Sequence, residues 1–292
     1  MAAQIVWLDG AGAELADVGE RAAALDRLTG LAPHGVLVPR TFVLGRSMLR
    51  EFVVKARRDI SQHVPVKVPP EVVRDIAVAV RSLTGSVAVR RSPLEVAADG
   101  AEAHWLTTTM GGRPERETYL HLTDATEVSE AVRRLWGPAS GGREPPVAIM
   151  VQRFMVPEVC AAVRRDRTDP ELLHIMSSLG TGDLLANGLV VPDRHRLRRA
   201  TGEVLTCSLG RKAQMTVPRP DGGLVRVPVP AQAARQLAVD DDKLRELYAT
   251  WRSAEEALPG LAAMGLSWSG GRWYVTSAVS RSPAVHDEIM LG

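Results

Sequence analysis

The spacing of apolar and polar residues along the first half of the chain predicts an alternation of helices and short strands. Apolar residues recur at helical spacing in four segments, residues 17–28, 48–58, 71–82 and 124–136. Strand-like apolar runs are found at residues 41–44, 86–90 and 118–120. Residues 91–116 follow neither pattern and are rich in Gly and Thr, which predicts a long loop of the kind that is often functional in compact domains.

The second half of the chain is mostly of β type. It starts after a Gly- and Pro-rich break at residues 137–146. Strands are predicted at residues 147–151, 188–197 and 203–209. A helix with an acidic start, residues 241–257, leads into a hairpin between Gly265 and Pro283. These elements predict a mixed α/β (α+β) fold with two lobes, residues 1–145 and 146–282, and a tail at 283–292.

The composition and charge of the chain mainly exclude classes of protein. With 45% hydrophobic and 24% charged residues, the chain has the composition of a soluble globular protein. No apolar run approaches the roughly 20 residues of a membrane helix, and the N-terminus MAAQIVWLDGAGAEL has an acidic residue where a signal peptide has basic ones. We therefore expect a cytoplasmic protein without a membrane segment. The formal net charge of +2 is too small to indicate nucleic acid, and Cys160 and Cys207 form no CxxC pattern that would suggest a zinc site.

Short motifs then follow one another in a specific order. They are Val18-Gly19-Glu20-Arg21-Ala22, Val38-Pro39-Arg40-Thr41-Phe42-Val43, Ala88-Val89-Arg90-Arg91-Ser92-Pro93, Glu117-Thr118-Tyr119-Leu120, the segment 149–156, the segment 180–193, Leu209-Gly210-Arg211-Lys212 and Val227-Pro228-Val229-Pro230. Together they resemble the N-terminal nucleotide-binding domain of the phosphoenolpyruvate synthase, pyruvate phosphate dikinase and rifampin phosphotransferase family. The clearest match is GTGDLLANGLVVPD at 180–193, which is similar to the family's GLGE-x-lVsG-x-vtPD.

The resemblance implies an ATP-grasp architecture, in which two lobes close on ATP. It places Arg21 at the family's phosphate-binding lysine, Arg90 at its signature arginine, and Thr118 and Gln152 at further ATP contacts. An arginine in place of a lysine keeps the charge but offers a planar fork instead of a compact ammonium group. The structural alternative is that Arg90 is a surface charge at a strand end and Gln152 a hydrogen-bonded core amide.

The hairpin departs from the family pattern. The family's DIEW strand is Gly265-Leu266-Ser267-Trp268 here, so that Ser267 replaces the metal-binding glutamate. In the second strand Ser277 replaces a glutamine and Val279 a phosphate-contacting arginine. Mg²⁺ prefers carboxylate ligands beside substrate phosphates, and two hydroxyls are a poor substitute. We predict no metal ligands at Ser267 and Ser277, and we regard Asp183 and Glu117 as the carboxylates that could hold Mg²⁺ instead.

Two functions remain open. The first is an ATP-dependent phosphotransferase subunit with weakened or lost metal-dependent catalysis, acting in trans with a partner that carries a swivelling phosphohistidine domain. It requires such a partner because none of the seven histidines lies in the family's phosphohistidine motif and the chain ends soon after the hairpin. The second is a non-catalytic protein that binds a nucleotide, another anionic ligand or a protein partner in a regulatory or scaffolding role.

Three other patterns are interpreted structurally. Gly265-Leu266-Ser267-Trp268-Ser269 lacks the second glycine of the GxSxG elbow of serine hydrolases. The basic run at 194–199, as a strand, places Arg194, Arg196 and Arg198 on one face, as expected for a solvated edge or an anion-binding cleft rather than a nucleic-acid site. The acidic run at 240–242 is interpreted as the cap of the last helix.

Overall fold

The computed structural model describes residues 5–63, 65–94, 118–140, 147–166 and 168–280. Its strands form three sheets, with orders β1-β2-β5-β3-β4, β13-β12-β6-β7-β8-β9 and β10-β11. All strand pairs within these sheets are antiparallel. The α/β class with two sheet-centred lobes is therefore confirmed.

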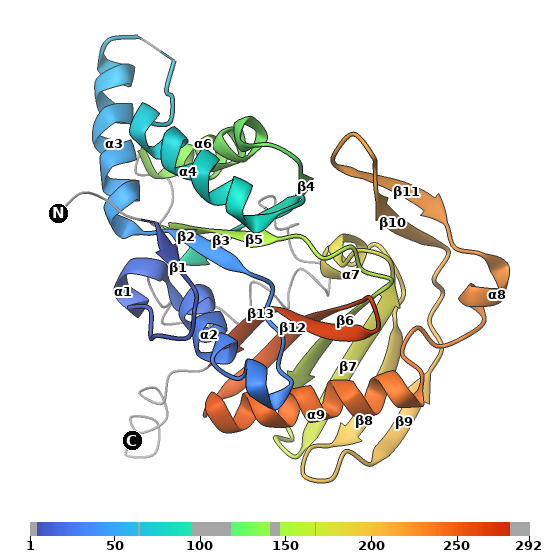
Figure 1. Ribbon diagram of the computed structural model, residues 1–292. Helices are drawn as coiled ribbons and strands as arrows, with labels where there is room; N and C mark the ends of the chain where they lie inside the picture. Colours follow the sequence, from blue (N-terminus) through green and yellow to red (C-terminus); the bar gives the residue numbers. More distant parts are fainter. Residues whose placement is uncertain (1–4, 64, 95–117, 141–146, 167, 281–292) are drawn as a thin grey trace.

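The five-stranded sheet carries three helices on one face (Figure 1). Its strands are β1 (Val6–Trp7), β2 (Thr41–Leu44), β3 (Val87–Pro93), β4 (Thr118–Leu122) and β5 (Val147–Arg153). The three helices are α3 (Arg46–Ser61), α4 (Pro70–Leu83) and α6 (Ala125–Ser140). Trp136 of α6 is fully buried, its ring packs on Phe52 with centroids 5.4 Å apart, and its Nε1 donates to the Val147 carbonyl at 3.0 Å. These contacts fix the helices to the central strand β5.

The six-stranded sheet has a long helix on one face and a short helix on the other (Figure 1). Its strands are β6 (Val159–Arg165), β7 (Leu172–Leu179), β8 (Asp193–Arg198), β9 (Val204–Ser208), β12 (Leu261–Ser269) and β13 (Arg272–Ser280). The accompanying elements are α7 (Asp183–Ala186), β10 (Gln214–Pro218), β11 (Leu224–Pro228), α8 (Ala231–Ala234) and the long α9 (Asp241–Ala257). The Asp240 side chain caps α9 by accepting from the Lys243 amide at 2.9 Å, so the expected acidic cap is confirmed.

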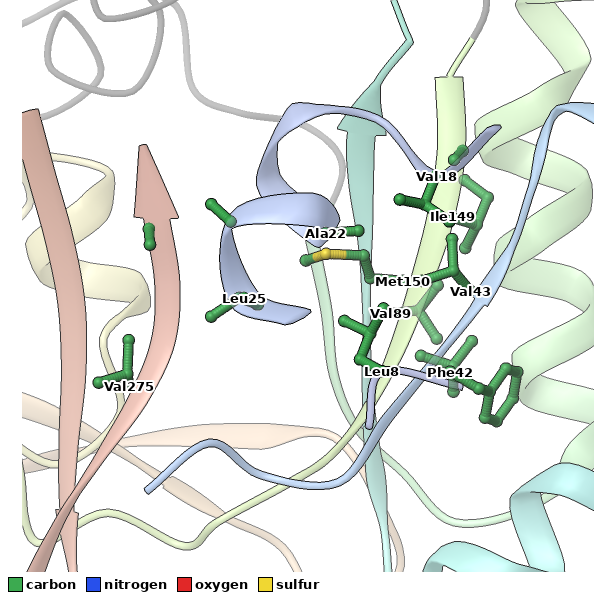
Figure 2. Close-up of a cluster of buried hydrophobic side chains, with 14 of the residues drawn as sticks. Leu8, Val18, Ala22, Leu25, Phe42, Val43, Val89, Ile149, Met150 and Val275 are labelled. Carbon is green, nitrogen blue, oxygen red and sulfur yellow. The ribbon is translucent and has the colours of Figure 1, made fainter. Parts of the chain in front are cut away.

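One hydrophobic core runs from the first sheet to the second through helix α2 (Glu20–Thr29), which follows the short α1 (Leu15–Val18) and precedes the 3₁₀ turn Ala32–His34. Figure 2 shows Leu25 on the side of α2 that faces Val275 of β13, and Ala22 near Met150 of β5. Because α2 packs against both sheets, its first turn lies where the two lobes meet.

The structure confirms most of the predicted elements and changes several of them. Strand 41–44 and helix 241–257 have the predicted bounds. The expected helix 17–28 is broken at Gly19 into α1 and α2. The strand expected at 188–197 begins only at Asp193, because the preceding segment contains α7 and a loop. Most of the predicted 91–116 loop lies outside the described residues.

Sheet membership does not change at the predicted lobe boundary. Although residues 147–151 lie beyond position 145, β5 pairs with β2 and β3 in the middle of the first sheet. The change from the first to the second sheet comes after Arg153. The predicted break at 137–146 begins within α6, which runs to Ser140, and it precedes β5 of the first sheet; the lobe boundary at residue 145 stays a prediction.

A buried ion pair ties the last part of the chain to β8. Lys212 Nζ lies 2.5 Å from Asp193 Oδ1, and both side chains are completely buried. The amides of Gly210 and Ala238 also donate to this carboxylate, each at 2.7 Å. The carboxylate therefore holds three segments together: β8, residues 209–212 and the chain that leads into α9.

Candidate functional site: a pocket between the two sheets

A pocket opens between one face of the five-stranded sheet, where alternate residues of β3, β4 and β5 line it, and one face of the six-stranded sheet. All four residues predicted to contact ATP, Arg21, Arg90, Thr118 and Gln152, line it. Ser267 and Ser277, which stand where the family has a metal-binding glutamate and a glutamine, also line it, whereas Val279, at the position of the phosphate-contacting arginine, is not among the lining residues that the structure describes. The structure thus brings together residues that are as much as 256 positions apart in the chain (277 − 21). Their role in binding ATP stays a prediction.

Arg90 connects the two lobes across this pocket. It lies in β3 directly opposite Thr118 of β4. Its Nη1 donates to the Thr276 carbonyl of β13 at 2.9 Å. The alternative of a free surface charge at a strand end does not describe this residue, because the guanidinium group reaches across to the second sheet.

Gln152 was interpreted either as an ATP contact or as a hydrogen-bonded core amide, and its position fits both. Its side chain is buried, with 1% exposed, and its Nε2 donates to Thr41 Oγ1 at 3.1 Å. Thr41 Oγ1 in turn donates to the Pro39 carbonyl at 2.7 Å. The residue is therefore a hydrogen-bonded core amide that also lines the pocket, and its neighbours hold it in one orientation.

The start of α2, which carries Arg21, is held by the end of β3. The Ala22 amide donates to Ser92 Oγ at 3.1 Å, which satisfies one of the free N–H groups of the first helical turn. Gly19 precedes the helix with a φ of 81°, and a Cβ atom there would lie 2.4 Å from the Pro93 carbonyl oxygen. The sequence analysis did not predict this contact between the start of α2 and β3, although Gly19, two residues before Arg21, indicated a close approach.

Replacing Gly19 with alanine is expected to destabilise the protein by more than the same change at Gly35. Both glycines have a positive φ, at a cost of about 1 kcal/mol or more for alanine, but nothing lies within 4 Å of a Cβ at Gly35. Chemical denaturation of the two variants measures the difference. Equal losses of unfolding free energy would show that the close approach to β3 has no effect.

The floor of the pocket is poor in negative charge. Ser267 of β12 pairs with Cys160 of β6, and Gly265 pairs with Ser277 of β13. Asp183, the first residue of α7, is the single carboxylate among the described lining residues. The described part of the chain contains no group of three His, Cys, Asp or Glu side chains arranged to hold a metal ion. Glu117, the other candidate carboxylate, lies outside the described residues.

Asp183 is already engaged by hydroxyl groups. Thr181 Oγ1 donates to its Oδ1 at 2.5 Å, and Thr216 Oγ1 donates to the same oxygen. Thr216 belongs to β10, so these bonds attach the small β10–β11 sheet to the pocket. A divalent ion at Asp183 would find one carboxylate there, whose Oδ1 already accepts two hydrogen bonds.

Cys160 does not supply a nucleophile. Its side chain is buried in the pocket wall, and burial, more than any other cause, raises the pKa of the thiol to about 12. A thiol with that pKa is protonated at neutral pH and therefore unreactive. Among the described residues, the cationic side chains that line the pocket are Arg21, Arg90 and, at the end of β5, Arg153. Their positive charge favours an anionic ligand.

Comparison with known proteins identifies the family of the chain. Residues 15–264 match the family described as the pyruvate phosphate dikinase, AMP/ATP-binding domain. The chain belongs to this family. The ATP-grasp fold and the relationship to phosphoenolpyruvate synthase inferred from the motifs are thereby confirmed.

The related curated proteins are much longer than the matched region. A probable phosphoenolpyruvate synthase of Archaeoglobus fulgidus is 22% identical over 179 residues, which is 56% of this chain and 24% of the relative. Another, of Methanothermobacter thermautotrophicus, is 24% identical over 157 residues, 49% of this chain and 23% of the relative. The matches thus cover about a quarter of each relative's length.

Solved structures are more distant. A dinucleotide-forming acetyl-coenzyme A synthetase 1 of Ca. Korarchaeum cryptofilum, in complex with coenzyme A and Ca-AMPCP, is 15% identical, with a TM-score of 0.40 over 90% of this chain and 93% of that one. PH1788 of Pyrococcus horikoshii is 12% identical, with a TM-score of 0.39 over 79% of this chain and 98% of that one. We draw no functional conclusion from likeness at this level.

Proposed function

We propose that this chain binds ATP in the pocket between its lobes and serves as the nucleotide-binding component of a phosphotransfer system of the phosphoenolpyruvate synthase type, with a weakened or lost metal-dependent step. One observation carries the proposal. Arg21, Arg90, Thr118 and Gln152 converge on one pocket whose opposite wall holds Ser267 and Ser277 at the family's ligand positions. The family membership supports ATP as the nucleotide.

The charges of the pocket favour ATP binding but not metal-dependent phosphoryl transfer. Arg21, Arg90 and Arg153 line it with one carboxylate, and guanidinium groups bind phosphate through paired, charge-assisted hydrogen bonds. Phosphoryl transfer also requires metal ions, because they neutralise the charge that develops on the phosphates. If the site held such an ion, Asp183 and the ATP phosphates would be its ligands, and the ion would supply that neutralisation.

The proposal places the phosphate acceptor on another protein. No histidine is among the described residues that line the pocket. We therefore propose that a partner protein with a swivelling phosphohistidine domain takes up any phosphate, in the same cytoplasmic compartment. No helix in the described part of the chain is long and apolar enough to span a membrane.

Thermal unfolding with and without excess ATP tests the binding proposal. A ligand that binds only the folded state at 100 times its Kd stabilises that state by about 2.7 kcal/mol, so ATP should raise the Tm. AMP, which carries the adenosine group with a single phosphate, and inorganic sulfate, which is an anion without adenosine, serve as controls. An unchanged Tm in ATP at all concentrations would contradict the proposal.

A second function, a non-catalytic clamp with a regulatory or scaffolding role, is favoured by the hairpin alone. Ser267, Ser277 and Val279 are all neutral where the resemblance implies charged or metal-binding groups. Restoring the carboxylate with Ser267→Glu should make ATP binding depend on Mg²⁺, while the wild-type chain should show little dependence. A partner that becomes phosphorylated by the wild-type chain would favour the phosphotransferase over the clamp.

A further inference from the structure

The face of the six-stranded sheet that forms the pocket floor continues beyond the pocket as a row of cations. Along β8 exposed and buried residues alternate, and the exposed ones are Arg194, Arg196 and Arg198. Directly opposed residues of an antiparallel pair share a face of the sheet. Arg194 is opposite Met176 of β7, which is opposite the pocket residue Ala162 of β6. The arginine row therefore lies on the pocket side, opposite the face that α9 covers.

The charge of this row is only partly compensated. Arg198 Nε lies 2.9 Å from Glu203 Oε2, and both side chains are about half exposed. In the described parts of the chain, the side chains of Arg194 and Arg196 have no hydrogen-bond or ion-pair partner. Alternate residues of a strand are separated by about 6.6 Å, so the guanidinium groups repel one another. An anionic ligand laid along the row would relieve that repulsion.

The neighbouring strand β9 offers an open edge. It is the outermost strand of the sheet, and all five of its residues, Val204–Ser208, are exposed. It contains no charged residue and no proline, the devices with which proteins usually block such an edge. Val204 and Leu205 expose 46% and 37% of their surface. The outward N–H and C=O groups of β9 are therefore available to pair with another strand.

We propose that β9 and the arginine row of β8, Arg194, Arg196 and Arg198, form a docking site for an extended acidic segment of a partner protein. The segment adds to the sheet as a strand beside β9, and its acidic side chains lie on the face of Thr206 and Ser208. That face also carries the arginines, because Thr206 is opposite Arg196 and Ser208 is opposite Arg194. This interaction surface is separate from the nucleotide pocket and does not depend on the proposed function.

The chemistry favours a peptide over a nucleic acid. Peptide groups satisfy the free backbone groups of an edge strand, and side chains in alternation give the segment its specificity. A single-stranded nucleic acid would gain from stacking on aromatic rings, and neither β8 nor β9 contains Phe, Tyr or Trp. The added strand would lie about 10 Å from β8, within the combined reach of arginine and glutamate side chains.

Fluorescence anisotropy with a labelled peptide of alternating Glu and Thr tests the site, with a Lys–Thr peptide and a single-stranded oligonucleotide as comparison probes. The Glu–Thr peptide should bind the wild-type chain, and Arg194→Glu with Arg196→Glu should weaken binding by about tenfold or more. The control is Arg50→Glu with Arg57→Glu on the exposed face of α3, which makes the same change in net charge. Its affinity for the peptide should stay at the wild-type value.

Hydrogen–deuterium exchange separates strand addition from general charge attraction. Bound peptide should slow exchange of the β9 amides, and this protection should be lost in the Arg194→Glu, Arg196→Glu variant. Equal weakening by the α3 control, preferred binding of the oligonucleotide, absence of β9 protection, or a homodimer that already protects β9 without peptide would each overturn the proposal.

Discussion

Replacing Lys212 with methionine is expected to destabilise the protein by about 3–5 kcal/mol, since it leaves a buried charge without its counter-ion. Asp193 is fully buried and keeps only the amide donors of Gly210 and Ala238 in the variant. Chemical denaturation of both proteins measures the change in unfolding free energy. We expect the variant to lose a large part of its stability, because entire domains are stable by only about 5–15 kcal/mol.

Lys55→Met is the matched control for this change. Lys55 Nζ lies 2.6 Å from Asp59 Oδ2 on α3, but its side chain is 35% exposed, so the pair should contribute about 1 kcal/mol or less. If the Lys212 variant does not fold, urea titration of Lys212→Arg, which keeps the charge and changes the shape, replaces it. A loss at Lys212 no greater than at Lys55 would contradict the structural role given to the buried pair.

Replacing Arg90 with methionine is expected to lower the affinity for ATP by about tenfold to a hundredfold. A hydrogen bond to a charged group contributes about 1.5–3 kcal/mol, and each 1.4 kcal/mol is a factor of ten. The substitution also removes the bond from Nη1 to the Thr276 carbonyl, which helps to hold the lobes together. Calorimetric titration gives the affinity, and the Tm of the nucleotide-free variant shows how much of the effect is on the fold.

Arg74→Met on the exposed side of α4 is the control, since it makes the same chemical change away from the pocket. ATP should bind this control with wild-type affinity. Arg21→Met tests the predicted phosphate contact at the start of α2 and should resemble the Arg90 variant. Wild-type affinity in both pocket variants would show that ATP binds elsewhere.

Much of the fold followed from patterns of local spacing. Helix 241–257 was predicted with its true bounds, because its acidic cap and apolar face are both local features. The exposed face of Arg194, Arg196 and Arg198 likewise followed from alternation along one strand. Local spacing gave no information on sheet partners, however, and β5 lies in the first sheet because its buried residues fit between β2 and β3.

The site was predicted as a set of residues rather than as a geometry. Motif order selected Arg21, Arg90, Thr118 and Gln152, and the structure places all of them on one pocket. The motifs did not reveal how Arg90 reaches Thr276, because that contact joins residues 186 positions apart. The same limit applies to the approach of Gly19 to β3, which depends on the packing of the two segments.

The sequence analysis also did not predict the hydrogen bonds that Asp183 accepts from Thr181 and Thr216. Asp183 was named as a carboxylate that could hold a metal, but its two hydroxyl donors come from separate segments. These bonds occupy one carboxylate oxygen, Oδ1. The chemistry of the pocket thus depends on how the small β10–β11 sheet packs, which no short motif describes.

Calorimetric titration of the wild-type chain with ATP, with and without Mg²⁺ and followed by analysis of the samples for ADP and AMP, tests most directly whether the clamp persists without its metal chemistry. We expect saturable binding that Mg²⁺ does not strengthen, and no product. Binding that requires Mg²⁺ and yields ADP or AMP would contradict this, and would show that a carboxylate other than the family's hairpin glutamate holds the metal ion.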